Sequence, residues 1–551
     1  MEDIERLTFP ALFAETIKKN GNRPAMALVG EDPITYFDLD KKIRALIAWF
    51  EKLGIKPGDK VAILSLSIPN WGVSYYAITF MGAVVVPVLP DFHVNEIANI
   101  LQHSEAKVIL VSDGLRSKIN EIPAEKLPLK IRIEDFTLIE TSNQTIGFEH
   151  DAKPVHDYKV TENDLAAIIY TSGTTGKSKG VMLSHHNICF TARMSDRVQE
   201  IKETDRFLSI LPLSHTYENT IGLILPMTKG ACIYYLGKVP TPSALLPALQ
   251  IIKPTVMLTV PLIIEKIFRS RIKPKFTSNP FLRLAVHIPF LRRKLNVIAG
   301  KKLLETFGGE LQFFGIGGAR LNRTVETFLI EAKFPYAIGY GLTETSPLVA
   351  GSNPRNSRLQ STGPQINGIE LIIHNPDTIT GEGEIWAKGP NVMMGYYKEP
   401  DLTAEMITKD GWLRTGDLGL LDKDGFLYIK GRLKNMIVRS GGENIYPEEI
   451  ESVINNFRHV MDSIVLDQNG KLKALVHFNR EEIADWIHQH PKVEKNITFD
   501  QEIEILCTEL QTYVNHRVNK YSQIQEVIIQ YEPFEKTATQ KIKRYLYRHS
   551  V

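Results

Sequence analysis

The chain has 551 residues, more than one simple hydrophobic core accommodates, so we expect two or more domains. Hydrophobic residues make up 43% and charged residues 23%, as in ordinary globular proteins, and the formal net charge of +2 gives no electrostatic reason to expect a nucleic-acid partner. The three cysteines, Cys189, Cys232 and Cys507, lie far apart, which indicates a reducing compartment rather than a disulfide framework or a zinc site. Residues 1–6 are acidic with no apolar stretch, so we expect no signal peptide and a cytoplasmic location.

Short apolar runs alternate with helix-like segments through most of the chain, a pattern typical of α/β proteins with largely parallel sheets. The predicted strands include residues 61–64, 84–86, 108–111 and 255–258. Residues 61–90 carry no charge, but their prolines and polar side chains favour a buried strand, helix and strand over a membrane-spanning helix.

A phosphate-binding loop is predicted where a buried strand, residues 165–170, runs into Thr171-Ser172-Gly173-Thr174-Thr175-Gly176-Lys177. Glycines let backbone N–H groups approach an anion, hydroxyls donate hydrogen bonds, and Lys177 and Lys179 add positive charge. The Walker A motif needs a glycine five positions before its Gly-Lys pair. Thr171 stands there, so an ordinary P-loop kinase or GTPase is disfavoured.

Two further segments contain residues that matter below. In residues 212–218, a lone His215 taken by itself would be a core or surface residue. The family resemblance given below implies that His215 or Tyr217 positions a carboxylate, and it leaves the choice open. Residues 313–320 read as a strand that runs into a glycine turn, where exposed backbone can lie flat against a purine or accept from its amino group. The turn residues are Gly317, Gly318 and Ala319.

The run Tyr340-Gly341-Leu342-Thr343-Glu344-Thr345 combines groups that suit a metal-bound nucleotide. Tyr340 can stack on adenine, and Thr343 can hydrogen-bond a phosphate. Glu344 supplies a hard carboxylate oxygen of the kind that Mg²⁺ prefers. A Thr–Glu helix cap is the simpler alternative.

Near Gly381 the pattern changes to short antiparallel strands with glycine turns, at residues 381–386 and 425–429. Asp417 stands between two glycines, where a turn would let its carboxylate accept both ribose hydroxyls. After Arg432 the chain reads as a compact α+β unit of ordinary domain size. Residues 536–544, near the C-terminus, taken alone read as a solvated basic segment.

Together and in this order, these segments resemble the signatures of the adenylate-forming enzymes, which include acyl-CoA synthetases, luciferases and peptide-synthetase adenylation domains. The resemblance covers nearly the whole chain. It implies an α/β fold with a large N-terminal domain, residues 1–433, made of two α/β sheets and a small β-barrel-like subdomain. It also implies a small mobile α+β domain, residues 434–551, that reorients about a hinge at Lys434.

The resemblance also implies roles for individual residues. Lys541 matches the catalytic lysine, although Gln540 stands where the family usually has glycine, and Glu344, Thr343 and His215 match supporting catalytic positions. The implied nucleotide- and CoA-binding residues are Thr171, Ser172, Gly173, Thr174, Thr175, Gly176, Lys177, Gly317, Gly318, Ala319, Tyr340, Gly341, Asp417, Arg432 and Gly442. The implied Mg²⁺-binding residues are Thr171 and Glu344.

The implied reaction joins a carboxylic acid to ATP as acyl-AMP and then transfers the acyl group to the thiol of CoA. Residues 212–218 and the run from Gly341 to Pro347 are most similar to medium- and long-chain fatty acid–CoA ligases. An acyl carrier protein stays open as the acceptor, which would make the chain a fatty-acyl-AMP ligase or acyl-carrier-protein synthetase. A non-catalytic nucleotide-binding scaffold is less favoured, because Glu344, Asp417 and Lys541 are retained.

Eleven Lys and Arg residues, interleaved with Phe and Leu, lie between Lys266 and Lys302. Such a segment predicts peripheral contact with anionic lipid on the inner face of a membrane, where fatty acids partition. Two alternatives stay open: the basic residues steer CoA phosphates or an acidic carrier protein, or they form a plain solvated helical face.

Overall fold

The computed structural model describes residues 6–139, 147–172, 178–277, 279–438, 444–489, 499–537 and 541–547. The chain divides into two compact units, which we describe separately. Unit 1 comprises Met1–Ile372, Trp386–Arg414 and Asp422–Leu427, and unit 2 comprises Ile373–Ile385, Thr415–Leu421 and Tyr428–Val551. The domain boundary between residues 433 and 434 stays a prediction.

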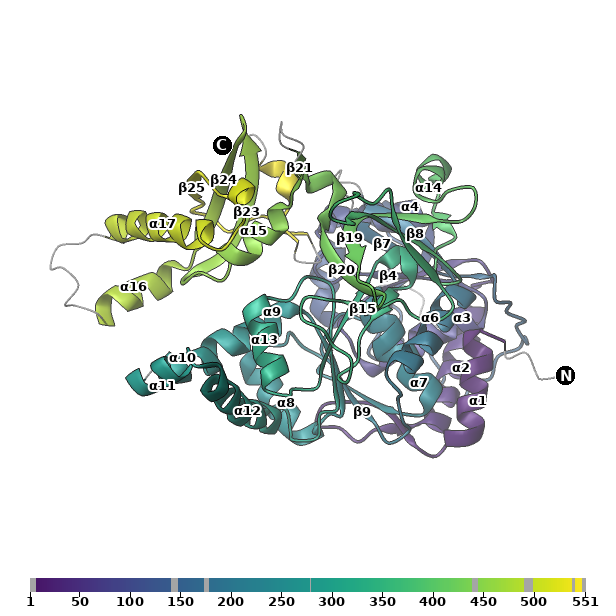
Figure 1. Ribbon diagram of the computed structural model, residues 1–551. Coiled ribbons are helices and arrows are strands. Elements are labelled where there is room, and N and C mark those ends of the chain that lie inside the picture. Colours follow the sequence, from purple (N-terminus) through teal and green to yellow (C-terminus); the bar gives the residue numbers. More distant parts are fainter. Residues whose placement is uncertain are drawn as a thin grey trace. The chain divides into compact units, whose positions relative to one another are not determined.

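Unit 1 contains a seven-stranded sheet in the order β18-β8-β7-β4-β3-β5-β6. Figure 1 labels three of its strands, β4, β7 and β8. Its strands are β3 (Lys60–Leu64), β4 (Val84–Val88), β5 (Ala106–Val111), β6 (Leu129–Arg132), β7 (Leu165–Ser172), β8 (Ser178–Ser184) and β18 (Gly395–Tyr396). The strands from β7 to β6 in this order pair in parallel, whereas β8 pairs antiparallel with both β7 and β18. The predicted strands at 61–64, 84–86 and 108–111 are confirmed.

The second sheet of unit 1 has eight strands in the order β14-β13-β12-β11-β9-β10-β1-β2. Its strands are β1 (Pro24–Leu28), β2 (Ile34–Thr35), β9 (Arg206–Ser209), β10 (Cys232–Tyr235), β11 (Val256–Thr259), β12 (Phe313–Ile316), β13 (Tyr336–Gly341) and β14 (Leu348–Gly351). Only its two edge pairs, β1 with β2 and β13 with β14, are antiparallel. The α/β class with largely parallel sheets is therefore confirmed.

Helices connect these strands, as parallel crossovers require. The helices of unit 1 are α1 (Phe9–Asn20), α2 (Tyr36–Lys52), α3 (Pro69–Phe80), α4 (Val94–Ser104), α5 (Arg116–Asn120), α6 (His185–Val198), α7 (Leu225–Lys229), α8 (Pro242–Ile252), α9 (Pro261–Ile267), α10 (Lys273–Thr277), α11 (Pro280–Ala285), α12 (Pro289–Thr306), α13 (Arg323–Glu331) and α14 (Pro400–Met406).

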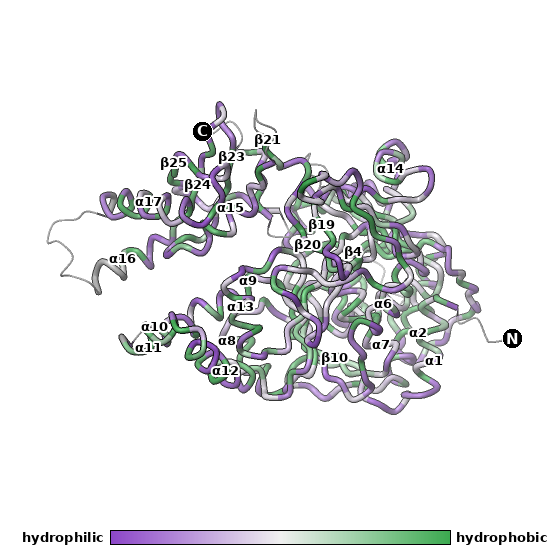
Figure 2. Tube along the Cα trace, viewed as in Figure 1, coloured by the Kyte–Doolittle hydropathy of each residue, from purple (hydrophilic) through white to green (hydrophobic). Residues whose placement is uncertain are grey.

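The uncharged stretch 61–90 folds as β3, α3 and β4, as predicted. Hydrophobic residues run along β4 (Figure 2). Within α3, the rings of Trp71 and Tyr75 stack with centroids 5.4 Å apart, and both side chains are buried. Among the residues that the structure describes, no helix is both long and apolar enough to cross a membrane.

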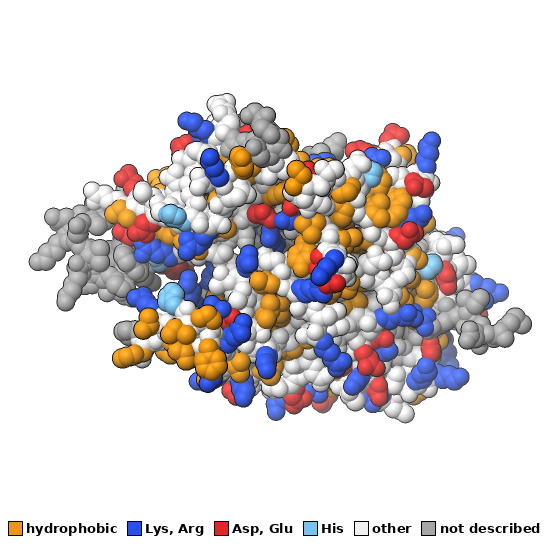
Figure 3. Space-filling model, viewed as in Figure 1, with side chains coloured by type: hydrophobic (Ala, Val, Ile, Leu, Met, Phe, Trp, Pro, Cys, Tyr) orange, Lys and Arg blue, Asp and Glu red, His pale blue; other side chains and the backbone are white. Residues whose placement is uncertain are grey.

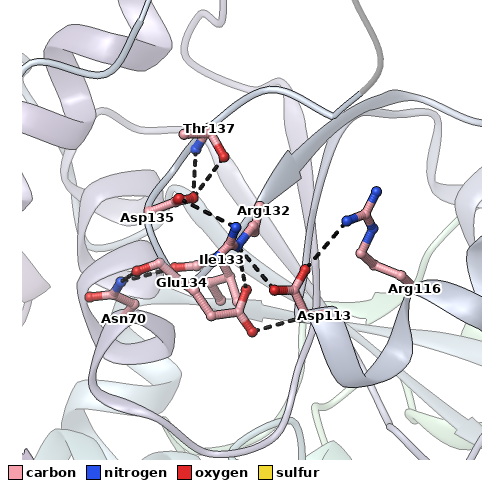
Figure 4. A network of polar contacts seen from close by, with 8 residues as sticks. All are labelled: Asn70, Asp113, Arg116, Arg132, Ile133, Glu134, Asp135 and Thr137. Atoms are coloured by element: carbon pink, nitrogen blue, oxygen red, sulfur yellow. Dashed lines mark hydrogen bonds and ion pairs between the residues drawn. The ribbon is translucent and has the colours of Figure 1, made fainter.

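A network of polar contacts fixes the edge of the seven-stranded sheet where β5 and β6 end (Figure 4). The carboxylate of Asp113 lies 3.2 Å from Arg132 Nε and 3.5 Å from Arg116 Nη1. The side-chain amide of Asn70, in the first turn of α3, donates to the carbonyl oxygens of Ile133 and Glu134 at 2.9 and 2.8 Å. These contacts tie α3 to the end of β6.

A five-stranded sheet has the order β15-β20-β19-β17-β16, and all its strands except β15 contain residues of both units. Its strands are β15 (Gly363–Pro364), β16 (Glu370–His374), β17 (Gly383–Lys388), β19 (Leu413–Leu421) and β20 (Phe426–Arg432). The strands predicted at 381–386 and 425–429 correspond to β17 and β20.

The rest of unit 2 is an α+β fold, as expected. Its sheet strands are β21 (Ile437–Val438), β22 (Asn444–Ile445), β23 (Val460–Gln468), β24 (Lys471–Phe478) and β25 (Glu526–Ile529), and its helices are α15 (Pro447–Ile454), α16 (Arg480–Gln489) and α17 (Phe499–Asn515). β24 pairs antiparallel with β23 and parallel with β25. Apolar side chains of α15, α17 and this sheet form one core.

Candidate functional site

The phosphate loop predicted at 171–177 begins on a strand that is longer than the sequence suggests. β7 continues through Thr171 and Ser172, which pair with Lys179 and Ser178 of β8. Thr171 and Ser172 therefore lie on a strand rather than in a loop, because antiparallel pairing satisfies their backbone groups. The other predicted loop residues, Gly173, Thr174, Thr175, Gly176 and Lys177, lie outside the described residues.

The structure brings Glu344 close to this hairpin through a residue that the sequence did not reveal. Tyr396, on β18, donates its hydroxyl hydrogen to Glu344 Oε1 at 2.8 Å. Its ring lies under the ammonium of Lys179, with Nζ 5.5 Å from the ring centroid, a cation–π contact. Because Lys179 pairs with Thr171, both predicted Mg²⁺-binding residues belong to one connected region of unit 1.

The sharp turn after β13 explains the glycine in the Tyr340–Thr345 segment. A Cβ at Gly341 would lie 1.6 Å from the carbonyl oxygen of Pro347, so no other residue fits there. Thr343 and Glu344 then lie in a short 3₁₀ turn, and Leu342 N–H donates to Thr345 Oγ1 at 2.9 Å. The turn presents the half-buried side chains of Thr343 and Glu344 at the carboxyl end of β13.

The predicted glycine turn follows β12 as expected. Gly318 has φ = 84°, a left-handed conformation that favours glycine. The ring of Tyr217 packs against this segment, because a Cβ at Gly317 would lie 3.2 Å from its Cε1 and one at Gly315 3.0 Å from its hydroxyl oxygen. Gly317 thus forms one wall against which Tyr217 is held.

A narrow apolar pocket, with a volume of about 50 Å³, lies between this glycine segment and helix α6. Its walls come from the ends of α6, β11, β12, β13 and β14; they include Tyr217, Val256, Leu258, Ala337, Leu348 and Gly351. Tyr217 is part of the wall, whereas the ring Nδ1 of His215 accepts a hydrogen bond from Tyr217 N–H at 3.2 Å. The role of His215 stays a prediction.

Glu218 lies buried beside this wall, at the start of a π-helical segment from Glu218 to Ile224. Its Oε1 accepts from Ser209 Oγ at 2.6 Å, and its Oε2 has no hydrogen-bond partner among the described residues. Burial raises the pKa of this carboxyl group to about 8. π-Helical turns often occur at functional sites, so this segment is a further sign that the pocket beside it is functional. An uncharged glutamic acid could not be foreseen from the sequence.

In unit 2, Asp417 and Arg432 lie together. Arg432 Nε is 2.6 Å from Asp417 Oδ1, and the Asp417 side chain is only 5% exposed. Asp417 lies inside strand β19 and not in the predicted turn. Gly416, the glycine before Asp417, has φ = 68° but lies within the strand and does not end it. Thr415 Oγ1 donates to the carbonyl oxygen of Ile385 at 2.6 Å, a contact that holds this part of β19 against the neighbouring strand β17.

In the lysine segment of unit 2, residues 535–537 pair with residues 541–543 as a β-hairpin. Gln540 lies outside the described residues. Lys541 N–H donates to Thr537 Oγ1 at 3.2 Å, and Thr537 N–H donates to the Lys541 carbonyl at 2.8 Å. Lys434, the predicted hinge residue, lies in an exposed 3₁₀ turn from Leu433 to Asn435. Gly442 lies outside the described residues.

The donors around Glu344 suit Mg²⁺. Tyr396 donates to Oε1 of this half-buried carboxylate, and no donor to Oε2 occurs among the described residues. A magnesium ion takes one or two carboxylates together with phosphates and water. Within the described parts of the chain, no group of three or more His, Cys, Asp or Glu side chains is placed to hold a metal by itself. Cys189, Cys232 and Cys507 are unpaired thiols.

The chain is similar in sequence to long-chain fatty acid–CoA ligases. The chain is 28% identical to a long-chain fatty acid–CoA ligase named heimdall from Drosophila melanogaster, over 83% of this chain and 74% of the relative. It is 30% identical to the long-chain fatty acid–CoA ligase ACSBG2 of Rattus norvegicus, over 81% of this chain and 73% of the relative. The human ligase ACSBG1 is also 30% identical, over 85% of this chain and 70% of the relative.

Solved structures share the fold. An ATP-bound RpMatB-BxBclM chimera superposes with a TM-score of 0.77 at 23% identity, over 99% of both chains. The o-succinylbenzoate CoA synthetase of Bacillus subtilis, in complex with its acyl-adenylate intermediate, gives a TM-score of 0.76 at 21% identity over 97% of both chains. The sequence model of the family described as AMP-binding enzyme matches residues 13–397, well over half of the chain. The chain therefore belongs to the AMP-binding enzyme family.

Proposed function

We propose that this chain is an ATP-dependent long-chain fatty acid–CoA ligase that forms AMP and pyrophosphate. The observation that supports the substrate class is the apolar pocket beside the glycine turn, whose walls offer hydrocarbon and only a few polar groups. Such a pocket suits an alkyl chain, which gains free energy in proportion to the apolar area that leaves water. The long-chain relatives support the same substrate class.

In the first half-reaction the fatty acid carboxylate attacks the α-phosphorus of ATP and pyrophosphate leaves. The product, acyl-AMP, has the good leaving group that a free carboxylate lacks. We assign Glu344 to the Mg²⁺ that accompanies ATP, a cation that neutralises charge developing on the phosphate oxygens. Thr343 and Lys541 would stabilise the same charge by hydrogen bonding, and Asp417 with Arg432 would hold the ribose.

In the second half-reaction the thiolate of CoA attacks the acyl carbonyl and AMP leaves. We propose that residues 434–551 reorient about Lys434 between the half-reactions, withdrawing Lys541 and presenting Gly442. Lys541→Ala should then abolish formation of acyl-AMP from acid and ATP but spare thioester formation from supplied acyl-AMP. Equal loss in both half-reactions would remove Lys541 from the catalytic step.

The acceptor thiol is also part of the proposal. Free CoA is favoured because the relatives are CoA ligases, and an acyl carrier protein is the alternative. Thioester formation measured with each acceptor at equal thiol concentration separates them. Transfer to a carrier phosphopantetheine but not to free CoA would make the chain a carrier-protein ligase.

A basic and apolar surface on unit 1 supports a cytoplasmic enzyme with reversible contact with a membrane. No Asp or Glu occurs in residues 266–304. Phe281 is 83% exposed and Phe290 64% exposed, and Leu284, Ile288 and Leu291 are exposed beside them. Figure 3 shows hydrophobic side chains gathered over α10, α11 and the start of α12, with Lys and Arg around them.

Helix α12, which carries part of this surface, is fixed to helix α13 by an ion pair. Arg292, in α12, makes a bidentate pair with Glu331 of α13 at 2.7 to 3.2 Å, so the helix is anchored. Lys294 Nζ lies 4.3 Å from the centroid of the Phe290 ring, so a positive charge lies directly beside an exposed apolar side chain. Apolar tips surrounded by cations complement a bilayer of anionic lipid.

Sedimentation with phosphatidylcholine vesicles, with or without about one-third phosphatidylserine, tests the contact. Phe281→Ser with Phe290→Ser should lower binding to the anionic vesicles about tenfold or more. Val155→Ser with Ile379→Ser, which removes two apolar side chains that are at least as exposed but lie elsewhere, should leave binding unchanged. Equal binding to neutral and anionic vesicles would contradict the preference for anionic lipid. No binding to either vesicle, or binding only to an acidic carrier protein, would contradict the membrane contact.

A further inference from the structure

The hairpin that carries Lys541 is held on the fold of unit 2 by an ion pair at each end. Before the turn, Lys536 Nζ lies 2.8 Å from Asp462 Oδ2 of β23. After Lys541, the guanidinium of Arg544 pairs with the carboxylate of Glu451 in α15. An isolated bridge between Lys536 and Ile542 closes the hairpin between them.

The Glu451 side of this arrangement is rigid. Glu451 Oε1 accepts from Val465 N–H of β23 at 2.7 Å, while Arg544 binds Oε2. Burial raises the pKa of Glu451, and the guanidinium of Arg544 opposes that shift. Glu448, one turn earlier in α15, adds a second negative charge near Arg544 and accepts from Asn435 Nδ2 at 2.7 Å. A buried ion pair of this kind fixes geometry strongly, because breaking it leaves an uncompensated charge.

We propose that Arg544 with Glu451 and Lys536 with Asp462 are positioning pairs that hold Lys541 for the adenylation half-reaction. The proposal rests on the role proposed above for Lys541. A lysine side chain is long and flexible, so the placement of its ammonium depends on the placement of its backbone. Misplacement of a catalytic group by about 1 Å is enough to cost about a hundredfold in rate.

The test measures both half-reactions separately in the full-length chain: pyrophosphate release from acid and ATP, and thioester formation from supplied acyl-AMP and CoA. Lys536→Met and Arg544→Lys should each lower the first about tenfold or more and leave the second within about twofold. The double variant Lys536→Asp with Asp462→Lys, which restores the pair with reversed charges, should recover much of the first rate. Lys473→Met, which breaks the 3.0 Å pair with Glu526 in the same sheet, is the matched control and should change neither.

Lys541→Ala, measured in the same assays, distinguishes the proposed role of Lys541 from the proposed role of the two ion pairs. If Lys541→Ala selectively loses adenylation but Lys536→Met and Arg544→Lys do not, the positioning pairs are refuted and the lysine role stands. If Lys541→Ala loses both half-reactions or neither, the lysine role fails and the positioning role fails with it. Equal loss of both half-reactions in Lys536→Met, with a lowered melting temperature, would show a merely structural pair and also refute the proposal.

Discussion

Arg432 Nε lies 2.6 Å from Asp417 Oδ1, so two residues that the sequence separately suggests for the nucleotide form one ion pair in unit 2. Asp417 is almost fully buried, whereas the Arg432 side chain is 42% exposed. The arginine thus fixes the carboxylate and still reaches solvent, where a ribose phosphate would approach. A carboxylate held in this way accepts hydrogen bonds in a fixed direction.

Asp417→Ala should raise the apparent KM for ATP, because the ribose loses its acceptor, with a smaller effect on the KM for the fatty acid. Hydrogen bonds to charged groups predict a change of about tenfold or more. Initial rates at varied ATP check it, and Asp377→Asn, which changes a carboxylate in an exposed turn, is the control. An unchanged KM for ATP with weakened fatty acid binding would contradict the ribose role.

Tyr396→Phe should weaken the use of Mg²⁺. The variant loses the hydroxyl that donates to Glu344 Oε1 but keeps the ring beside Lys179. We expect the Mg²⁺ concentration for half-maximal pyrophosphate release to rise about tenfold. Tyr397→Phe, which removes the hydroxyl of the neighbouring residue, should leave it unchanged. If the two variants behave alike, Tyr396 does not orient Glu344.

Gly351→Val should shorten the range of acids accepted. A Cβ at Gly351 would meet Val198 and Leu348 at 3.5 and 3.6 Å, ordinary contact distances, so the extra methyl groups extend into the pocket. We expect kcat/KM to fall about tenfold or more for a long acid and little for a short one. Gly351→Ala should give the same pattern at smaller size. A uniform loss across chain lengths would indicate that the pocket does not hold the alkyl chain.

Glu218→Gln should flatten the dependence of stability on pH. The ordinary pKa of glutamate is 4.5 and burial raises that of Glu218 to about 8. Between these values the unfolded chain releases a proton that the folded chain keeps, so the free energy of unfolding falls as pH rises. The loss from about pH 5 to about pH 8 is on the order of a few kcal/mol, and it should vanish in the variant.

Melting temperatures across this pH range check the Glu218 prediction. Asp38→Asn is the control, because the hydrogen bond with Thr35 lowers the pKa of Asp38 from 3.8. The contribution of Asp38 is therefore complete above its ordinary value and constant at higher pH, so this variant should keep the wild-type slope. An unchanged slope in Glu218→Gln would mean that Glu218 is already ionised in the folded chain.

The sequence predicted the parts of the site that depend on local pattern. Apolar runs gave β7 and β12, and the glycine at 341 is required by a close backbone approach within a few residues. Contacts between strands that are distant in the chain could not be predicted from the sequence. Tyr396 reaches Glu344 only because β18 pairs with β8, more than two hundred residues earlier in the chain. The sequence predicts a turn at Asp417 because glycine signals a turn, whereas in the structure neighbouring strands pair around it and Asp417 lies within β19.

The pairs around Lys541 were likewise hidden from the sequence. Residues 536–544 are a basic stretch by composition, and only the packing of the hairpin onto α15 and β23 gives Arg544 and Lys536 their acidic partners. Charge pattern alone cannot distinguish a solvated lysine from one whose backbone is held in place.

The central claim is that this chain activates long-chain fatty acids with ATP for transfer to CoA. Release of AMP and pyrophosphate, measured with ATP and Mg²⁺ over carboxylic acids from acetate to oleate, with and without CoA, tests it most directly. The account predicts sustained turnover with the long acids only when CoA is present. A single burst of pyrophosphate that CoA does not extend would contradict CoA as acceptor, and no turnover with any fatty acid would contradict the proposed activity.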